Sequence, residues 1–186
     1  MIITTRTAVL DDVPALNQLI EQSVRHLSVG YYTPSQIDSS LRYVFGVDTQ
    51  LIEDGTYYVA EADGSMVGCG GWSKRNTLYG GDQIKETEDP LLNPEHEPGR
   101  IRAFFVHPQW ARRGIGRTII EVCETAARRA GFRRLELAST LPGHPLYSQL
   151  GYETSEHFTL DFPDGEQLPL IRMHKTLVAT PNNSAS

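Results

Sequence analysis

The sequence predicts a single α/β domain with a mixed, mostly antiparallel sheet of about seven strands and about four flanking helices. Short segments rich in β-branched and aromatic residues are interspersed with segments whose apolar residues recur at helical spacing. In order, the expected elements are strand, helix, helix, three strands, helix, strand, helix and two strands. The 186 residues are enough for one hydrophobic core, and neither a repeat nor a linker divides them.

The first half of the chain contains three expected strands, at residues 2–8, 56–62 and 66–72, the last two joined by the hairpin signal Asp63-Gly64. A first helix, capped by Asp11 or Asp12 with Pro14 in its first turn, runs to about His26. Its apolar stripe is Val13, Leu16, Ile20, Val24 and Leu27. A second helix opens at Thr33 and Pro34 and ends at Gly46, with Ile37, Leu41, Val44 and Phe45 on its buried face.

The second half begins with a long polar segment, residues 73–99, which has no sustained period and is expected to be a surface excursion. The elements expected after it are strand 101–107, helix 114–130, strand 134–139, short helix 145–150, and strands 154–162 and 168–176. The helix before Gly131 has the apolar stripe Ile115, Ile119, Val122, Cys123, Ala126 and Ala130. We therefore expect one domain over residues 1–177 and a disordered tail over 178–186.

Composition excludes several kinds of partner. The formal net charge of −6 disfavours nucleic-acid binding, which needs a basic surface. No apolar stretch approaches membrane-spanning length, and the first residues lack the pattern of a secretory signal. Cys69 and Cys123 are expected to be buried free thiols, as in a reducing compartment, so we expect the cytoplasm. The six histidines have no metal-ligand spacing, and we expect no metal.

A basic, glycine-rich turn, residues 112–117, separates the strand that Pro108 ends from the following helix. Backbone N–H groups at a helix start are unpaired and carry the positive end of the helix dipole. Gly114 and Gly116 have no Cβ and let a ligand approach the backbone closely. These features predict an anion site suited to phosphate or pyrophosphate. The alternative is a tight turn with solvated arginines.

Two well-known phosphate motifs do not fit this turn. A dinucleotide fingerprint would have a third glycine where Ile119 stands, and a Walker loop would end in Gly-Lys-Ser/Thr rather than Gly116-Arg117-Thr118.

Three pieces in consistent order resemble the GCN5-related N-acetyltransferase (GNAT) superfamily. They are Phe105-Val106-His107-Pro108 with the turn that follows, the strand 135–138, and Pro145-Leu146-Tyr147-Ser148-Gln149-Leu150-Gly151-Tyr152. The likeness covers nearly the whole chain and implies an open sheet whose central strands splay apart. It also implies transfer of an acetyl group from acetyl-CoA to an amine by direct attack.

The resemblance implies a set of cofactor-binding residues. The backbone of residues 104–106 would pair with the pantetheine arm, and the amides of the turn would hold the pyrophosphate. The implied set is Phe104, Phe105, Val106, Arg112, Arg113, Gly114, Ile115, Gly116, Arg117, Thr118 and Ser139. Two positions depart from the family pattern, since Ala111 replaces the usual Gln or Arg and Ser139-Thr140 replaces a common Asn.

Tyr147 matches the family's tyrosine general acid, which would protonate the departing thiolate. The alternative is a core tyrosine with a polar partner. The position of the family's base is held by Arg100 and Arg102, so no base stands there. Glu95, His96, Glu97 or a water chain could supply one.

Acceptor binding is predicted from two pairs of residues. Alternation along a strand puts Arg100, Arg102 and Phe104 on one face, unless a bulge intervenes. The arginine pair could bind an acceptor carboxylate, or could be surface arginines. Tyr31 and Tyr32 lie where the first two helices connect and could line the acceptor, or could be exposed loop residues.

The leading expectation is an N-acetyltransferase of small-molecule amines. Two alternatives are a protein or peptide N-acetyltransferase and a non-catalytic acyl-CoA-binding module. Dimers are frequent among relatives, so a homodimer is possible.

Overall fold

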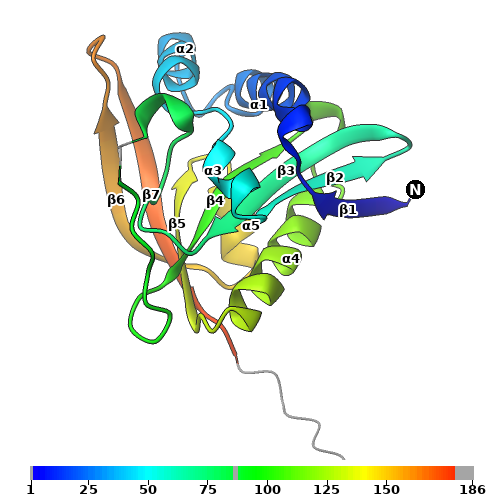
Figure 1. The fold of residues 1–186 in the computed structure, drawn as a ribbon. Helices are drawn as coiled ribbons and strands as arrows, with labels where there is room; N and C mark the ends of the chain where they lie inside the picture. The colour runs from blue at the N-terminus through cyan, green and yellow to red at the C-terminus, as the bar shows by residue number, and fades with distance from the viewer. Residues whose placement is uncertain (1, 86–87, 179–186) are drawn as a thin grey trace, which may run out of the picture.

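The computed structural model describes residues 2–85 and 88–178. Within them, seven strands form one sheet in the order β1-β2-β3-β4-β5-β7-β6 (Figure 1). The strands are β1 (Ile3–Thr7), β2 (Tyr57–Ala62), β3 (Ser65–Ser73), β4 (Gly99–Val106), β5 (Arg134–Thr140), β6 (Glu153–Asp161) and β7 (Gln167–Thr176). All neighbours are antiparallel except β4 and β5, which are parallel. The predicted fold class is confirmed.

Helices cover both faces of the sheet (Figure 1). They are α1 (Val13–Leu27), α2 (Pro34–Tyr43), α3 (Thr49–Glu53), α4 (Ile115–Arg129) and α5 (His144–Gln149). The first three pack with one hydrophobic cluster, and α4 and α5 pack with a second cluster on the opposite face. The short helix α3 was not predicted. Its N-cap is Asp48, whose carboxylate accepts a hydrogen bond from the backbone amide of Gln50.

The apolar stripe of α4 holds this helix against the sheet. Ile115, Ile119 and Cys123 are fully buried as predicted. Ala130, however, is exposed, because the helix ends at Arg129 and the chain turns away through Gly131, at φ 94°. Glu124 is buried on this side instead and accepts hydrogen bonds from Tyr152 and Lys175. Both cysteines are buried and free, as expected.

The start of α1 differs from the predicted cap. Asp12 occupies the N-cap position, but its side chain makes no capping hydrogen bond. Its carboxylate instead accepts two hydrogen bonds from Arg6 on β1 and one from the amide of Val9. A short 3₁₀ turn, Leu10–Asp12, leads into the helix. The Arg6–Asp12 ion pair thus ties the first strand to the start of α1.

The parallel pair β4 and β5 is joined only at its beginning. Gly99 pairs with Leu135 and Arg100 with Glu136, and among the described residues no strand pairing between β4 and β5 follows. The two strands therefore separate over the second half of β4. This separation is the splay that the predicted fold class includes, and it opens the middle of the sheet.

The excursion, residues 74–98 between β3 and β4, runs mostly over the surface as expected, but two of its described residues, Gly81 and Leu92, are buried. Leu92 is 7% exposed and belongs to the core beside α4. The amides of Gly81 and Asp82 donate to the carbonyl oxygens of Val44 and Val47, next to a 3₁₀ turn at Asp82–Ile84. The segment thus crosses one face of the sheet and docks on the connection between α2 and α3.

Of the expected tail, 178–186, only Val178 falls within the described residues, and it is exposed. No helix in the described parts of the chain is both long and apolar enough to span a membrane.

Candidate active site

A β-bulge lies at the centre of β4. Cys69 pairs with Phe105 and Gly71 with Arg102, so Ala103 and Phe104 together stand opposite Gly70. Ala103 has φ 55°, an unusual conformation for a residue with a side chain. The bulge breaks the expected alternation. Phe104 packs with the cluster beside α4, whereas Ala103 packs with the opposite cluster.

Two neighbours hold the bulge in place. The hydroxyl of the fully buried Tyr57 donates a hydrogen bond of 3.0 Å to the carbonyl of Ala103. On the other side, a Cβ at Gly70 would come within 2.7 Å of the Phe104 ring. Only glycine therefore leaves room for this ring against β3.

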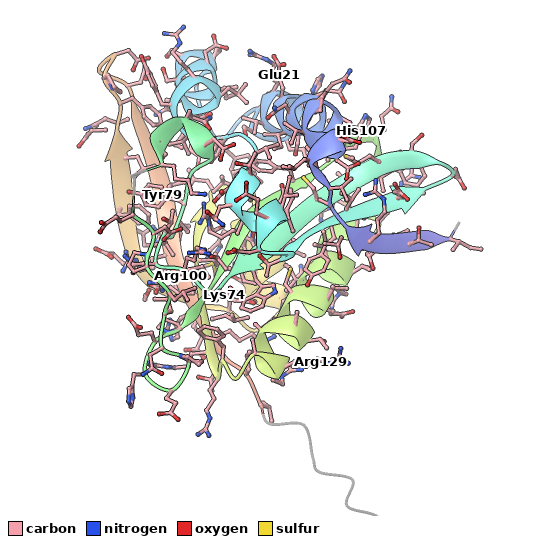
Figure 2. The ribbon with its side chains drawn as sticks, viewed as in Figure 1. Glu21, Lys74, Tyr79, Arg100, His107 and Arg129 are labelled. Atoms are coloured by element: carbon pink, nitrogen blue, oxygen red, sulfur yellow. The ribbon has the colours of Figure 1, made fainter. Side chains whose placement is uncertain are left out.

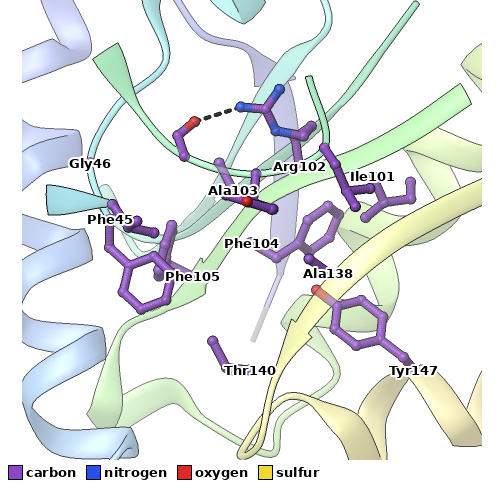
Figure 3. A pocket seen from close by; sticks show the side chains of 14 residues that line it. Phe45, Gly46, Ile101, Arg102, Ala103, Phe104, Phe105, Ala138, Thr140 and Tyr147 are labelled. Atoms are coloured by element: carbon purple, nitrogen blue, oxygen red, sulfur yellow. Dashed lines mark hydrogen bonds between the residues drawn. The ribbon is translucent and has the colours of Figure 1, made fainter. Parts of the chain in front are cut away.

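A small cavity of about 70 Å³ opens where β4 and β5 separate. It is lined by residues 44–46 of the α2–α3 connection, 78–80 of the excursion, 101–105 of β4, and Ala138, Thr140 and Tyr147. The close-up shows Phe104 and Phe105 on either side of the central strand, with Tyr147 beneath Phe104 (Figure 3). Strands and loops far apart in sequence thus meet around one cavity.

Tyr147, on α5, presents its hydroxyl at this cavity. Its ring centroid lies 6.4 Å from that of Phe104 and 5.8 Å from that of Tyr152, both in edge-to-face geometry. Within the described residues the Tyr147 hydroxyl has no hydrogen-bond partner, and it is turned toward Phe104 (Figure 3). Burial raises the pKa of the Tyr147 phenol well above its usual value. The side chain is therefore a protonated donor at neutral pH.

The basic turn before α4 presents an array of backbone amides. Arg112 and Gly114 both have positive φ, 61° and 84°, and Gly114 is the N-cap of α4. In the described part of the chain, no group accepts a hydrogen bond from the amides of 112–117, while Thr118 already donates to the carbonyl of Gly114. Six amides at the positive end of a 15-residue helix are thus available to an anion.

The model of the acetyltransferase (GNAT) family matches residues 21–152, which is most of the chain. The chain belongs to this family. As a GNAT protein it is an acetyltransferase that uses acetyl-CoA. No curated protein matches the sequence.

Solved structures agree on the fold. A GCN5-related N-acetyltransferase from Rhodopseudomonas palustris has a TM-score of 0.69 and 19% identity, over 95% of this chain and 99% of that one. The PaiA N-acetyltransferase of Thermoplasma acidophilum, in complex with coenzyme A, has a TM-score of 0.64, 14% identity and the same coverage. YncA of Salmonella typhimurium, with its cofactor acetyl-CoA, has a TM-score of 0.63 and 17% identity over the full length of both chains.

The residues around the turn fit coenzyme A. The available amides match a pyrophosphate, and the exposed Arg112, Arg113 and Arg117 surround them with positive charge. A Cβ at Gly116 would come within 2.7 Å of the Leu146 side chain, so glycine allows α5 to lie close to the helix start. Arg113 also lies over the Trp110 ring, at 5.1 Å.

Three other expected cofactor-binding groups have partners within the protein. The Thr118 hydroxyl donates to the carbonyl of Gly114. Ser139 is buried, and its hydroxyl donates to the carbonyl of Thr140. The amide of Val106 donates to the Ser23 hydroxyl of α1 at 3.2 Å. Among these residues, the amides of the turn are therefore the groups most accessible to a ligand.

In this GNAT protein, the two arginines of β4 are bound by other groups of the same chain. Arg102 donates to the Asp48 carboxylate at 3.0 Å and to the carbonyl oxygens of Gly80 and Thr77, and its side chain is 1% exposed. Arg100 forms an ion pair with Glu136. Arg100 and Tyr79 both stand on the face that the excursion crosses (Figure 2). The arginines thus anchor the excursion to the sheet.

The two tyrosines after α1 differ in their surroundings. Tyr31 is 52% exposed, and neither tyrosine lines the cavity. Tyr32 is buried, and its hydroxyl donates to the carbonyl of Pro169 at 2.7 Å and accepts from the amide of Leu141 at 2.9 Å. Tyr32 therefore joins the α1–α2 connection to β7 and to the end of β5.

Replacing Tyr32 with Phe should lower the free energy of unfolding by about 1–3 kcal/mol, because a part-buried carbonyl and a part-buried amide both lose their partner. Denaturant unfolding measures this change. Tyr31→Phe is the matched control, and its effect should stay within about 0.5 kcal/mol at an exposed position. Equal effects of the two substitutions would contradict the assignment.

The candidate bases do not lie at the cavity. The carbonyl of His96 accepts a hydrogen bond from Arg134, at the start of β5, whereas the cavity adjoins the end of this strand. No group of three or more potential metal-ligating His, Cys, Asp or Glu side chains occurs among the described residues.

Several cavity residues were missed from the sequence. Phe45 was predicted only as a buried helix residue, and Tyr79 was not singled out. Asp48, the partner of Arg102 outside the cavity wall, was not singled out either. One signal was present for the bulge, since glycines at 68, 70 and 71 within a predicted strand indicate close approach of another group. No comparable signal marked Tyr79, because the course of the excursion is set by its contacts with the α2–α3 connection.

Proposed function

We propose that this acetyltransferase acetylates the primary amine of a small molecule, by direct attack within a ternary complex. The proposal rests on the small size of the cavity and on the two segments that line its sides. Residues 78–80 close it from one side, and the α2–α3 connection closes it from another. A compact acceptor suits this small, partly open cavity better than a peptide, which needs an extended groove.

Acetyl-CoA would supply a thioester whose C–S bond breaks, with its electron pair leaving on sulfur, as the new C–N bond forms. In the proposal, the amides of residues 112–117 hold the pyrophosphate and the open edge of β4 faces the pantetheine arm. The Tyr147 hydroxyl donates the proton that the sulfur needs. The amine nitrogen loses one proton in the same turnover, which restores Tyr147 by way of solvent.

Turnover can be tested directly by following release of the coenzyme A thiol with acetyl-CoA and a panel of amines and peptides. The proposal expects steady turnover with at least one small primary amine and a product heavier by one acetyl group. If only peptides with free N-termini or lysines are acetylated, the acceptor is a protein and the proposal fails.

The two buried free thiols support a location in the cytoplasm, a reducing compartment.

The turn can be tested with a matched pair of glycines at the two ends of α4. Gly114 and Gly131 have similar positive φ, 84° and 94°, and a Cβ at either meets nothing closer than 3.7 Å. Each change to Ala should cost about 1–2 kcal/mol of unfolding free energy. Only Gly114→Ala should also raise the Kd for coenzyme A, by about tenfold or more, because it distorts the array of amides.

Calorimetric titration with coenzyme A and denaturant unfolding measure the two effects separately. Coenzyme A affinity that is the same in both variants would place the pyrophosphate elsewhere.

A further inference from the structure

We infer that the acceptor is a compact primary amine on an apolar or aromatic body that carries no second charge. The inference rests on the proposed function and narrows it to a substrate class. It follows from the chemistry of the cavity wall. Aromatic rings line this wall, and among the described residues it has no charged group without a partner in the protein.

No carboxylate lines the cavity in the described part of the chain. Asp48, the carboxylate that pairs with the wall residue Arg102, is 2% exposed and is also bound to Lys85. A diamine or polyamine would therefore bring a second ammonium group to a wall that offers it no counter-charge. Burying such an unpaired charge is costly.

No free cation lines the cavity among these residues either. Arg102 is the one cationic residue of the wall, and its guanidinium is bound to Asp48 and to the carbonyl oxygens of Gly80 and Thr77. An acceptor carboxylate, such as that of an amino acid, would find no guanidinium fork available to it. The wall thus selects against both signs of additional charge.

Aromatic rings make up much of the wall. The five aromatic lining residues are Phe45, Tyr79, Phe104, Phe105 and Tyr147. Such rings favour an aromatic or aliphatic body, and their faces also attract an arriving ammonium group. Once the amine is buried among them, desolvation lowers its pKa and favours the neutral nucleophile. Deprotonation of the acceptor therefore does not require a carboxylate or imidazole base in the wall.

The test compares two pairs of amines that differ by one charged group. Benzylamine is set against 2-phenylglycine, which adds a carboxylate, and butylamine is set against 1,4-diaminobutane, which adds an ammonium group. We expect kcat/KM to be higher by about tenfold or more for the singly charged member of each pair, because the added charge has no partner. Thiol release with acetyl-CoA and the full-length chain gives these values.

A substitution in the wall provides a second readout. Leu78→Asp puts a carboxylate in the cavity wall, and it should raise the ratio of kcat/KM for 1,4-diaminobutane over butylamine by about tenfold. Leu91→Asp is the matched control, since Leu91 belongs to the same excursion, is 63% exposed and does not line the cavity. It should leave the ratio unchanged.

The outcomes separate this inference from the proposed function. Preference for 2-phenylglycine or 1,4-diaminobutane would overturn the inference while leaving small-amine acetylation in place. An unchanged ratio in Leu78→Asp would also count against it. If peptides are acetylated and none of the four amines is, the proposed function and the inference are both overturned.

Discussion

Replacing Tyr147 with Phe should lower kcat by about 100-fold or more, the usual contribution of a positioned general acid. The change removes one hydroxyl and keeps the ring that packs against Phe104 and Tyr152. Coenzyme A affinity should therefore be preserved, because the proposed pyrophosphate site lies at the start of α4. Steady-state kinetics and calorimetric titration of the same preparation separate the two quantities.

Tyr79→Phe is the matched control for this experiment. Tyr79 lines the same cavity from the excursion, so its change also removes one phenolic hydroxyl. It should leave kcat within a few-fold of the parent enzyme. Similar losses in the two variants would mean that any hydroxyl lost from the cavity harms turnover, and Tyr147 would then have no special role.

The pH dependence gives an independent check on Tyr147. Burial raises the pKa of this phenol above 10, the ordinary pKa of a tyrosine. The donor therefore stays protonated beyond pH 10. Loss of this acid can lower kcat only at still higher pH. A decline in kcat that starts below pH 10 and disappears in Tyr147→Phe would be inconsistent with this assignment.

The fold could be predicted from the sequence because local signals agreed with one another. The stripe of α4, the hairpin at Asp63-Gly64 and the cap at Thr33 each mark an element, and each is found in the structure. The short helix α3 was missed because its five residues are fewer than two helical turns and show no period. The excursion lacked a period too, since tertiary hydrogen bonds rather than local propensity place it.

The candidate site could be predicted only where it is local in sequence. The turn before α4 is contiguous, so its glycines and arginines could be recognised together. The cavity wall, in contrast, joins Phe45, Tyr79 and Tyr147 from segments that meet only in the folded chain. The bulge at Ala103 changed the face of Phe104, and strand alternation by itself does not reveal a bulge.

The role of Arg102 illustrates the same limit. Its place on β4 suggested a ligand for an acceptor carboxylate, because sequence alone does not show what surrounds a guanidinium. In the folded protein the side chain is 1% exposed and bridges Asp48 to the excursion. A buried arginine with protein partners predicts an effect on stability, whereas an acceptor ligand predicts an effect on KM.

Arg102→Met should therefore lower the free energy of unfolding by about 3–5 kcal/mol, the usual result of removing one partner of a buried ion pair. The carbonyl oxygens of Gly80 and Thr77 would also lose their donor, and Asp48 would keep only Lys85 as a charged partner. Denaturant unfolding gives the value. Methionine keeps much of the side-chain volume, so cavity formation adds little to the effect.

Arg25→Met is the appropriate control, because Arg25 forms ion pairs with Glu21 and Asp38 on the surface, where its side chain is 45% exposed. Exposed pairs contribute little, and this variant should lose less than about 1 kcal/mol. If instead Arg102→Met folds as stably as Arg25→Met and raises KM only for acceptors with a carboxylate, Arg102 binds the acceptor. The inference of an uncharged acceptor body would then be wrong, because the cavity would hold a guanidinium available to an anion.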